Sequence, residues 1–165
     1  MTIHETLQHY SQLLKSVSDT AHLDMEYVLM HVMQCSRAQL FSHPEMPLNI
    51  SQQEQVEHAV KRRQQGEPMA YITGEKAFWD LNLKVTPAVL IPRPETELLV
   101  EWVLAHYPPS PALQIADLGV GSGAIALAIA KERPLWKIDA TDQSAEALSI
   151  AKENAKRHDL MSVQF

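Results

Sequence analysis

The residues of this sequence with the clearest capacity for chemistry form a glycine-rich run at 115–124, Ile-Ala-Asp-Leu-Gly-Val-Gly-Ser-Gly-Ala. Its three glycines, Gly119, Gly121 and Gly123, alternate with other residues between two apolar segments. A loop that brings its backbone against a ligand cannot carry a Cβ at the contact points, so glycines expose main-chain N–H groups and the N-terminus of the next helix. The pattern predicts a strand, a nucleotide-cofactor loop and a helix.

The residues around the glycines narrow the class of ligand. A phosphate-binding Walker loop needs Lys and then Ser or Thr after its last glycine, whereas this sequence has Ala124, so hydrolysis of a nucleoside triphosphate is not expected. Gly119, Gly121 and Ala124 satisfy the permissive dinucleotide pattern G-x-G-x-x-A, which stays open as an alternative. Asp117, two residues before the first glycine, would repel a pyrophosphate and suits a ligand with an ammonium or sulfonium charge.

A second carboxylate follows at the end of the next expected strand. Residues 137–142 read Lys-Ile-Asp-Ala-Thr-Asp, and a helix is expected over 144–156. An ionised carboxylate at a strand end can accept hydrogen bonds from both hydroxyls of a ribose, so we predict that Asp142 binds a ribose. The structural alternative is that Asp142 is the N-cap of the helix that begins near Ser144.

Composition and charge are those of an ordinary folded chain. The 165 residues are 45% hydrophobic and 21% charged, enough for one full domain or two small ones. The net charge of −6 disfavours tight binding to a nucleic-acid backbone, and the Lys-Arg-Arg run at 61–63 is interpreted as a solvated helix face. The single cysteine, Cys35, and the eight scattered histidines show no metal-ligand spacing. Without a leader-like start or a long apolar stretch, the protein is expected to be cytoplasmic.

The chain changes character near residue 75. Before this point apolar residues recur at helical spacing, as over 3–32, and predict a small helical domain. The Ser-x-x-Gln motif at Ser36 and the Ser-x-x-Glu motif at Ser51 are capping boxes that predict two further helix starts, and the Gly-Glu-Pro at 66–68 predicts the end of the second helix.

Two segments connect this helical part to the glycine run. Residues 77–85 combine aromatic and aliphatic side chains with the turn-forming Asp80 and Asn82, which indicates a β-hairpin or an extended connector. Residues 89–97 place a proline on each side of Arg93 and then lead into an apolar helix. Taken alone, this second segment is interpreted as a proline-rich helix entry.

Three motifs in a fixed order give the sequence a specific resemblance. They are Arg-Gln-Gln-Gly-Glu-Pro-Met-Ala-Tyr-Ile-Thr-Gly at 63–74, Leu-Ile-Pro-Arg-Pro-Glu-Thr-Glu at 90–97, and Asp-Leu-Gly-Val-Gly-Ser-Gly-Ala-Ile-Ala-Leu-Ala at 117–128. Together they resemble the HemK/PrmC family, glutamine methyltransferases that act on peptide chain release factors. The family usually has Thr where this chain has Val120, which keeps the β-branched shape but lacks the hydroxyl. Cofactor binding is expected to survive that change.

The resemblance implies a fold. It implies an α-helical N-terminal bundle and an α/β class I S-adenosylmethionine-dependent methyltransferase domain, Rossmann-like, with a β-hairpin connector between them. The expected divisions are a helical substrate-recognition domain at 1–75, the connector at 76–92, and the N-terminal part of the methyltransferase domain at 93–165. Since residues 162–165 are expected to form the third parallel strand, the chain is interpreted as an N-terminal fragment.

The resemblance also implies a reaction and a site. The family transfers a methyl group from S-adenosylmethionine to the side-chain amide nitrogen of the glutamine in the Gly-Gly-Gln loop of a release factor, a step of translation termination. Its amide-binding residues lie in an Asn-Pro-Pro-Tyr motif that this sequence lacks. No catalytic residue and no metal ligand is therefore assigned, and the chain alone is expected to be inactive, with weak or no affinity for the cofactor. The residues expected to bind the cofactor are Asp117, Gly119, Val120, Gly121, Ser122, Gly123 and Asp142, and in addition Arg93, Pro94, Glu95 and Thr96.

Two other functions stay open. A nucleic-acid amino-group methyltransferase would share the loop, although the acidic charge and the helical N-terminal domain count against it. A non-catalytic module that docks a release factor through its helical domain is the other. The expected partners are release factors, with no membrane and no direct nucleic acid.

A sheet of so few strands has a consequence for folding. The first strand becomes an edge with unpaired backbone N–H and C=O groups, and apolar helix faces are exposed. Self-association or partial disorder of residues 113–165 is therefore expected, whereas the helical domain should be the more autonomous part.

Overall fold

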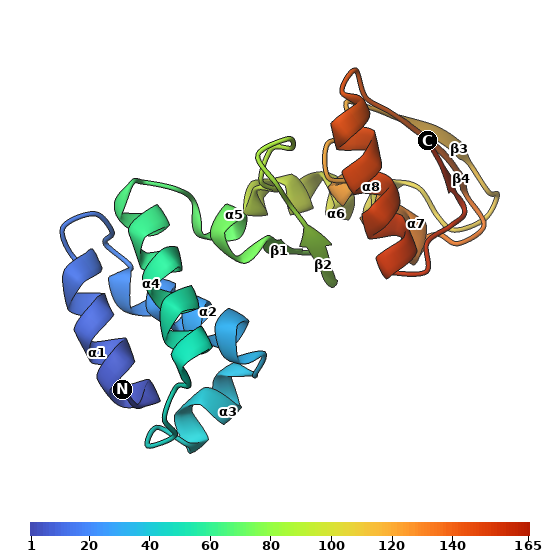
Figure 1. The fold of residues 1–165 in the computed structure, drawn as a ribbon. Helices are drawn as coiled ribbons and strands as arrows, with labels where there is room; N and C mark the ends of the chain where they lie inside the picture. Colours follow the sequence, from blue (N-terminus) through green and yellow to red (C-terminus); the bar gives the residue numbers. More distant parts are fainter. The chain divides into compact units, whose positions relative to one another are not determined.

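The computed structural model describes all residues from Met1 to Phe165. The chain forms two compact units, Met1–Thr73 and Gly74–Phe165 (Figure 1). The expected division into 1–75, 76–92 and 93–165 stays a prediction about domains; in the structure the segment 76–92 lies within the second compact unit. No helix in the structure combines the length and the apolar character needed to cross a membrane.

All regular elements of the first unit are helices, and one isolated β-bridge joins Thr2 to Pro47. Its helices are α1 (Ile3–Leu14), α2 (Ala21–Met33), α3 (Arg37–Ser42), α4 (Ile50–Gln64) and α5 (Met69–Thr73). Apolar side chains from α1, α2, α3 and α4 form one core, in which Leu14, Met25, Leu29, Leu40 and Val56 are at most 1% exposed. The helical spacing of apolar residues in the first half of the sequence is thus the pattern of one shared core.

The starts of two helices test the predicted capping boxes. The box at Ser36 is confirmed, because its side chain accepts from the backbone N–H of Gln39 and the Gln39 side chain accepts from that of Ser36. The box at Ser51 is wrong: α4 begins earlier, with Asn49 as N-cap and Gln52 as its reciprocal partner. Asn is as good an N-cap as Ser, and Asn49 has in Gln52 the reciprocal partner that completes its capping box.

The basic run at 61–63 contributes to the structure of this unit. The Nε atom of Arg63 lies 2.7 Å from a carboxylate oxygen of Asp24, a residue only 5% exposed. Arg62 binds both carboxylate oxygens of Glu67, at 2.7 and 2.6 Å, and donates to the carbonyl of Tyr71. The interpretation of the run as a solvated face is therefore wrong for both arginines, which join α4 to α2 and to the segment before α5.

The second unit begins with a hairpin and continues as a parallel α/β layer. Strands β1 (Glu75–Phe78) and β2 (Leu81–Lys84) are antiparallel, whereas β3 (Gln114–Leu118), β4 (Lys137–Thr141) and β5 (Val163–Gln164) form a parallel sheet in that order. The helical elements are η1 (Pro94–Thr96), α6 (Glu97–His106), α7 (Ala124–Glu132) and α8 (Ala145–Arg157). The predicted fold class, with its hairpin and three parallel strands, is confirmed.

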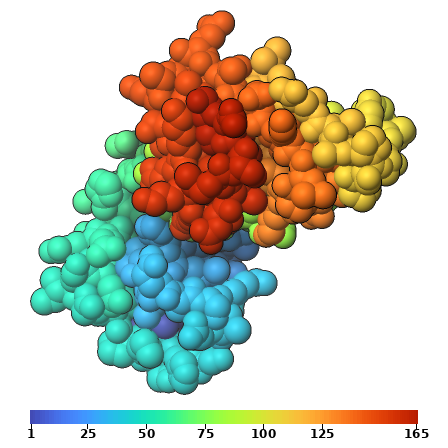
Figure 2. Space-filling view, turned by 90° about the vertical axis from the view of Figure 1, so that its right-hand side faces the viewer, coloured from blue at the N-terminus to red at the C-terminus, as the bar shows by residue number.

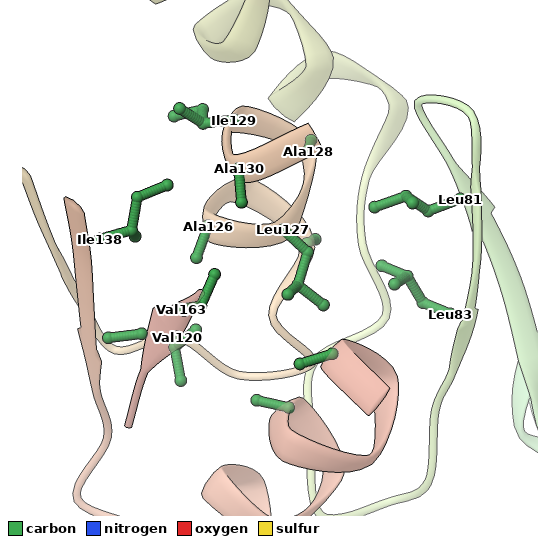
Figure 3. Close-up of a cluster of buried hydrophobic side chains, with 14 of the residues drawn as sticks. Leu81, Leu83, Val120, Ala126, Leu127, Ala128, Ile129, Ala130, Ile138 and Val163 are labelled. Atoms are coloured by element: carbon green, nitrogen blue, oxygen red, sulfur yellow. The ribbon is translucent and has the colours of Figure 1, made fainter. Parts of the chain in front are cut away.

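The core of the second unit lies between the sheet, α7, α8 and the hairpin. Along β4, Ile138 and Ala140 are buried against the helices, whereas Lys137 and Thr141 are exposed. Figure 3 shows Leu81 and Leu83 pointing from β2 toward α7, whose Leu127 is fully buried. The hairpin therefore shares one hydrophobic core with the layer that carries the glycine loop.

Strand β3 is at the edge of the sheet, as expected. It pairs with β4 on one side only, and Leu118 at its end is 78% exposed. Beside it runs a groove of about 460 Å³ lined mostly by apolar side chains of β3, α6 and α7. The segment around 100–112, yellow in Figure 2, stands out from the rest of this unit and carries the half-exposed Trp102 and Tyr107. An unpaired strand beside an apolar groove favours association.

We expect the protein to self-associate through this edge. Leu118→Lys places a charge on the exposed edge and should shift the protein toward monomer, because edge charges oppose strand pairing between chains. Sedimentation at increasing protein concentration measures the change. Leu135→Lys is the matched control, since Leu135 is 75% exposed but lies outside β3. A wild-type protein that stays monomeric, or an equal effect of both variants, would contradict this prediction.

Candidate functional site

Residues 119–123 form the loop between β3 and α7. Gly119, Gly121 and Gly123 have φ values of +89°, +55° and +90°, a region that residues with a Cβ rarely adopt. At Gly123, which is the N-cap of α7, an added Cβ would lie only 2.8 Å from Cδ1 of Leu127. Glycine is therefore required here by backbone conformation and by the close packing of the loop on α7.

Three consecutive amides at the start of the loop are held by the end of β4. The backbone N–H groups of Gly119 and Val120 donate to the carbonyl of Thr141, at 2.8 and 2.9 Å. The N–H of Gly121 donates to Oδ2 of Asp142 at 2.9 Å. These three N–H groups bond within the protein and shape the loop, and the expected cofactor contacts of these residues stay a prediction.

The amides that remain for a ligand lie farther along. The N–H of Gly123 donates to the carbonyl of Val120 at 2.8 Å, which closes a tight turn. The N–H groups of Ser122, Ala124 and Ile125 have no acceptor in the protein. Two of them belong to the first turn of α7, where unpaired amides and the helix dipole favour an anion.

Asp142 binds backbone amides with both oxygens. Oδ1 accepts from Ser144 N–H and Oδ2 from Gly121 N–H, each at 2.9 Å. These N–H groups, that of Ser144 first, hold the pKa of the Asp142 carboxyl below its usual value. The N-cap of α8 is Ser144, whose hydroxyl accepts from Ala147 N–H, so the alternative role of Asp142 as N-cap is wrong. Each carboxylate oxygen keeps a second lone pair that can accept from a hydroxyl.

Asp117 is in the opposite electrostatic situation. Its Oδ2 is buried with no hydrogen-bond partner, and burial raises the pKa of its carboxyl, helped by the nearby charge of Asp142 and opposed by the N–H of Ala126. Because the folded pKa is raised, the stabilising contribution belongs to the protonated form and is lost as the pH rises through that pKa. A partly buried carboxylate without a partner can be neutralised by a cationic ligand group.

Two other predicted loop residues are buried. Val120 is 6% exposed, and its side chain belongs to the core of the second unit and lies near Val163 in Figure 3. Ser122 is 3% exposed, and its carbonyl accepts a hydrogen bond from Asn154 at 2.8 Å. The side chain at position 120 therefore packs in the hydrophobic core, where the hydroxyl that Val120 lacks would be buried.

The segment 93–96 stands apart from this loop. Arg93, Pro94 and Glu95 are exposed, and no hydrogen bond or ion pair joins 93–96 to the glycine loop or to Asp142. The next residue, Glu97, accepts from the backbone N–H of Trp79 at 2.8 Å. Trp79 has φ +56° in the hairpin turn, so Glu97 stabilises a strained turn.

Two residues that hold the loop were missed from the sequence. Thr141 acts through its carbonyl, for which no side-chain signal exists. Asn154 lies 32 residues beyond Ser122, and its signal is an Asn among alanines on the buried face of α8. A buried Asn in a helix must satisfy the hydrogen bonds of its amide, so this pattern is the signal that would have indicated Asn154.

The two N–H bonds to Asp142 predict a pH-dependent loss of stability in Asp142→Asn. An amide can accept from one N–H group but presents its own NH₂ to the other, so we expect a loss of about 1 kcal/mol at neutral pH. A carboxyl with a lowered folded pKa contributes above its unfolded pKa of about 3.9, and the contribution is lost as the pH falls through the folded pKa. Urea unfolding across this range measures it.

The matched control is Asp139→Asn, within β4 and three residues before Asp142, where the carboxylate accepts only a weak 3.3 Å bond from Gln114. This variant should change stability little at any pH. A difference between wild type and Asp142→Asn that stays constant down to pH 3, or a control that loses as much, would contradict the assignment.

Comparisons with known proteins agree with the two units. Residues 5–74 match the PrmC N-terminal domain and residues 94–165 match the Methyltransferase small domain. The chain is 58% identical over its full length to "Release factor glutamine methyltransferase" of Coxiella burnetii, covering 60% of that protein. It is 43% identical over 99% of its length to the protein of the same name from Shewanella oneidensis, covering 57% of it. It is 45% identical to that of Escherichia coli over 84% of its length, covering 50% of it.

The chain thus spans about half to three fifths of the length of these curated relatives. A solved structure, coclaurine N-methyltransferase bound to N-methylheliamine and SAH, aligns with 97% of the chain and 48% of that structure at 14% identity and a TM-score of 0.39. A similarity this low supports no conclusion about this protein. The order of the two matched domains and the identity along the whole chain show that it belongs to the PrmC family, with a PrmC N-terminal domain followed by a methyltransferase domain.

Proposed function

We propose that this chain belongs to an enzyme that methylates the glutamine side-chain amide in the Gly-Gly-Gln loop of peptide chain release factors. We propose that its second unit supplies the cofactor site for S-adenosylmethionine. The observation that carries the proposal is the agreement between the relatives' shared name and a glycine loop whose remaining polar groups suit this cofactor. The reaction would take place in the cytoplasm, where translation terminates.

The polar groups that the fold leaves without partners fit the parts of S-adenosylmethionine. The unpaired amides of Ala124 and Ile125 suit a carboxylate, because they lie at the N-terminus of a helix. The unpartnered oxygen of Asp117 suits an ammonium group, and the free lone pairs of Asp142 suit ribose hydroxyls. No group for the adenine ring is assigned.

The bound cofactor supplies an electrophilic methyl group on a sulfonium. The residues of this chain would hold and orient it: Thr141 and Asp142 fix the loop, and the partly buried carboxylate of Asp117 would neutralise positive charge. A glutamine amide is a poor nucleophile because its nitrogen lone pair is delocalised into the carbonyl. It must be oriented by hydrogen-bond acceptors in line with the methyl carbon. The Asn-Pro-Pro-Tyr motif that would supply them is absent from this sequence.

We expect S-adenosylmethionine to bind this chain weakly but saturably, and NADH not to bind. Replacing Asp142 is a poor test of ribose binding, because Asp142 also holds Gly121. The sharper test changes the ligand. An analogue that lacks both ribose hydroxyls should bind about tenfold more weakly, which corresponds to the loss of charge-assisted hydrogen bonds.

Calorimetric titration with S-adenosylmethionine, the dideoxy analogue and NADH measures these affinities. Saturable binding of NADH would contradict the cofactor class. Equal affinity for the two adenosyl ligands would leave the class but remove Asp142 as the ribose-binding residue.

We also expect no methyl transfer by this chain alone. The assay follows labelled methyl groups from S-adenosylmethionine into a release factor, with a full-length release factor glutamine methyltransferase as positive control and a polynucleotide as a second acceptor. Methylated glutamine would show that acceptors other than the missing motif orient the amide. Label in the polynucleotide would favour the nucleic-acid methyltransferase alternative.

A further inference from the structure

One fully buried side chain joins the glycine loop to the hairpin. Asn154 lies on the inner face of α8 and is 0% exposed. Its Oδ1 accepts from the backbone N–H of Lys84 at 2.7 Å, and its Nδ2 donates to the carbonyls of Lys84 and Ser122, at 2.9 and 2.8 Å. Both donors of the amide are used, and the three main-chain groups that it binds belong to two segments far apart in the sequence.

The two bonds to Lys84 resemble those of a neighbouring strand. Lys84 pairs with Glu75 across the hairpin, and the following N–H, of Val85, donates to Gly74. In an antiparallel ladder such bonds alternate, so the N–H and C=O of Lys84 point away from β1. Asn154 binds both of these groups, which would otherwise be unpaired at a half-buried position.

The third bond fixes the middle of the glycine loop. Ser122 lies between Gly121 and Gly123, and because its carbonyl shares a planar peptide with the N–H of Gly123, the bond from Asn154 fixes the direction of that N–H. The end of β4 holds the first part of the loop through Thr141 and Asp142, whereas Asn154 holds the second part from α8. These anchors come from different elements, so neither determines the loop conformation alone.

The packing of α8 explains why an Asn can reach both partners. Besides Asn154, its buried face carries three alanines and Ile150, and Ala151 is 0% exposed. The Cβ of Ala151 would lie 3.5 Å from a Cβ at Gly123, so the helix passes directly beside the loop. Farther along the helix, Glu153 forms an ion pair with Nζ of Lys84, and Arg157 pairs with Glu75.

From this arrangement we infer that Asn154 is a positioning residue that couples hairpin docking to the conformation of the cofactor loop. When the hairpin leaves α8, Asn154 loses two of its three partners, and its remaining bond to Ser122 is no longer fixed in direction. Loop order and hairpin docking therefore favour one another, and by reciprocity a ligand on the loop strengthens hairpin docking. The role of Asn154 in cofactor binding rests on the proposed function. The structural coupling of the hairpin to the loop through Asn154, called the tie below, does not.

Site-resolved amide hydrogen exchange of the full chain tests the tie without any ligand. In Asn154→Ser the amides of Lys84, Gly121 and Gly123 should exchange about tenfold faster than in wild type, relative to the amides of β4. The N–H of Lys84 loses its acceptor, and the two glycines lose the bond that holds Ser122 between them. Asn154→Ala is the second variant. Ile138→Val is the control for a general loss of stability, and its faster exchange should be spread evenly over the unit. Glu153→Gln removes the ion pair to Lys84 and leaves Asn154 in place, so the loosening of the hairpin that it causes should also reach Gly121 and Gly123.

The result that overturns the inference is faster exchange at Lys84 with unchanged Gly121 and Gly123, which would make Asn154 a hairpin anchor only. An even increase over all amides, as in Ile138→Val, would overturn it as well. If neither Asn154 variant folds, the test uses the wild-type chain with and without S-adenosylmethionine. The inference then requires that saturating S-adenosylmethionine slows amide exchange at Lys84 as well as at Gly121.

Titration with S-adenosylmethionine adds a functional readout. Asn154→Ser should bind about tenfold more weakly than wild type, whereas Ile138→Val should bind like wild type. Equal binding by wild type and Asn154→Ser would overturn the coupling. A wild-type chain that binds no S-adenosylmethionine would count against the proposed function, while the exchange experiment without ligand would still decide the tie.

Discussion

The site depends on the hydrogen bonds between the end of β4 and the first amides of the glycine loop. Leu118 and Thr141 are paired at the ends of β3 and β4, so the loop leaves its strand beside the Thr141 carbonyl and the Asp142 carboxylate. Glycine supplies positive φ values, but freedom alone would leave the loop disordered. The parallel pairing of β3 with β4 places hydrogen-bond acceptors beside the loop and so selects one loop conformation. In it, some loop amides bond within the protein and others have no acceptor.

The two carboxylates of the site differ because their surroundings differ. Asp142 receives backbone N–H groups on both oxygens and is held ionised, whereas Asp117 is more buried, and its Oδ2 has no partner. Their pKa values therefore move in opposite directions. Asp142 is a structural anchor whose oxygens keep free lone pairs, whereas Oδ2 of Asp117 is buried without a hydrogen-bond donor or a positive charge beside it. A cationic ligand group can satisfy the charge at this buried position.

The sequence predicts the parts of the fold that follow from local pattern. The strand, glycine loop and helix at 114–132, the box at Ser36 and the hairpin all have signals within a few residues. Its errors arise where a distant partner decides. The sequence predicts that Arg63 is solvated, but in the structure it binds Asp24, which lies 39 residues away. The predicted start of α4 is wrong because Asn49, and not Ser51, is the N-cap. The cofactor role of the predicted site residues stays a prediction, although the structure brings Asp142 to the loop.

The anchors that no local pattern reveals share one chemistry, a side chain bound to main-chain atoms of a remote segment. Glu97 binds the Trp79 amide, Asn154 binds Lys84 and Ser122, and Arg133 donates to the carbonyl of Leu104 at the end of α6. Such bonds place backbone rather than side chains, so they tolerate changes in the residues whose backbone they hold. The hairpin, α6 and the glycine loop are thus fixed by a few residues elsewhere, and Asn154, which binds the Ser122 carbonyl, constrains the loop without needing to touch a ligand.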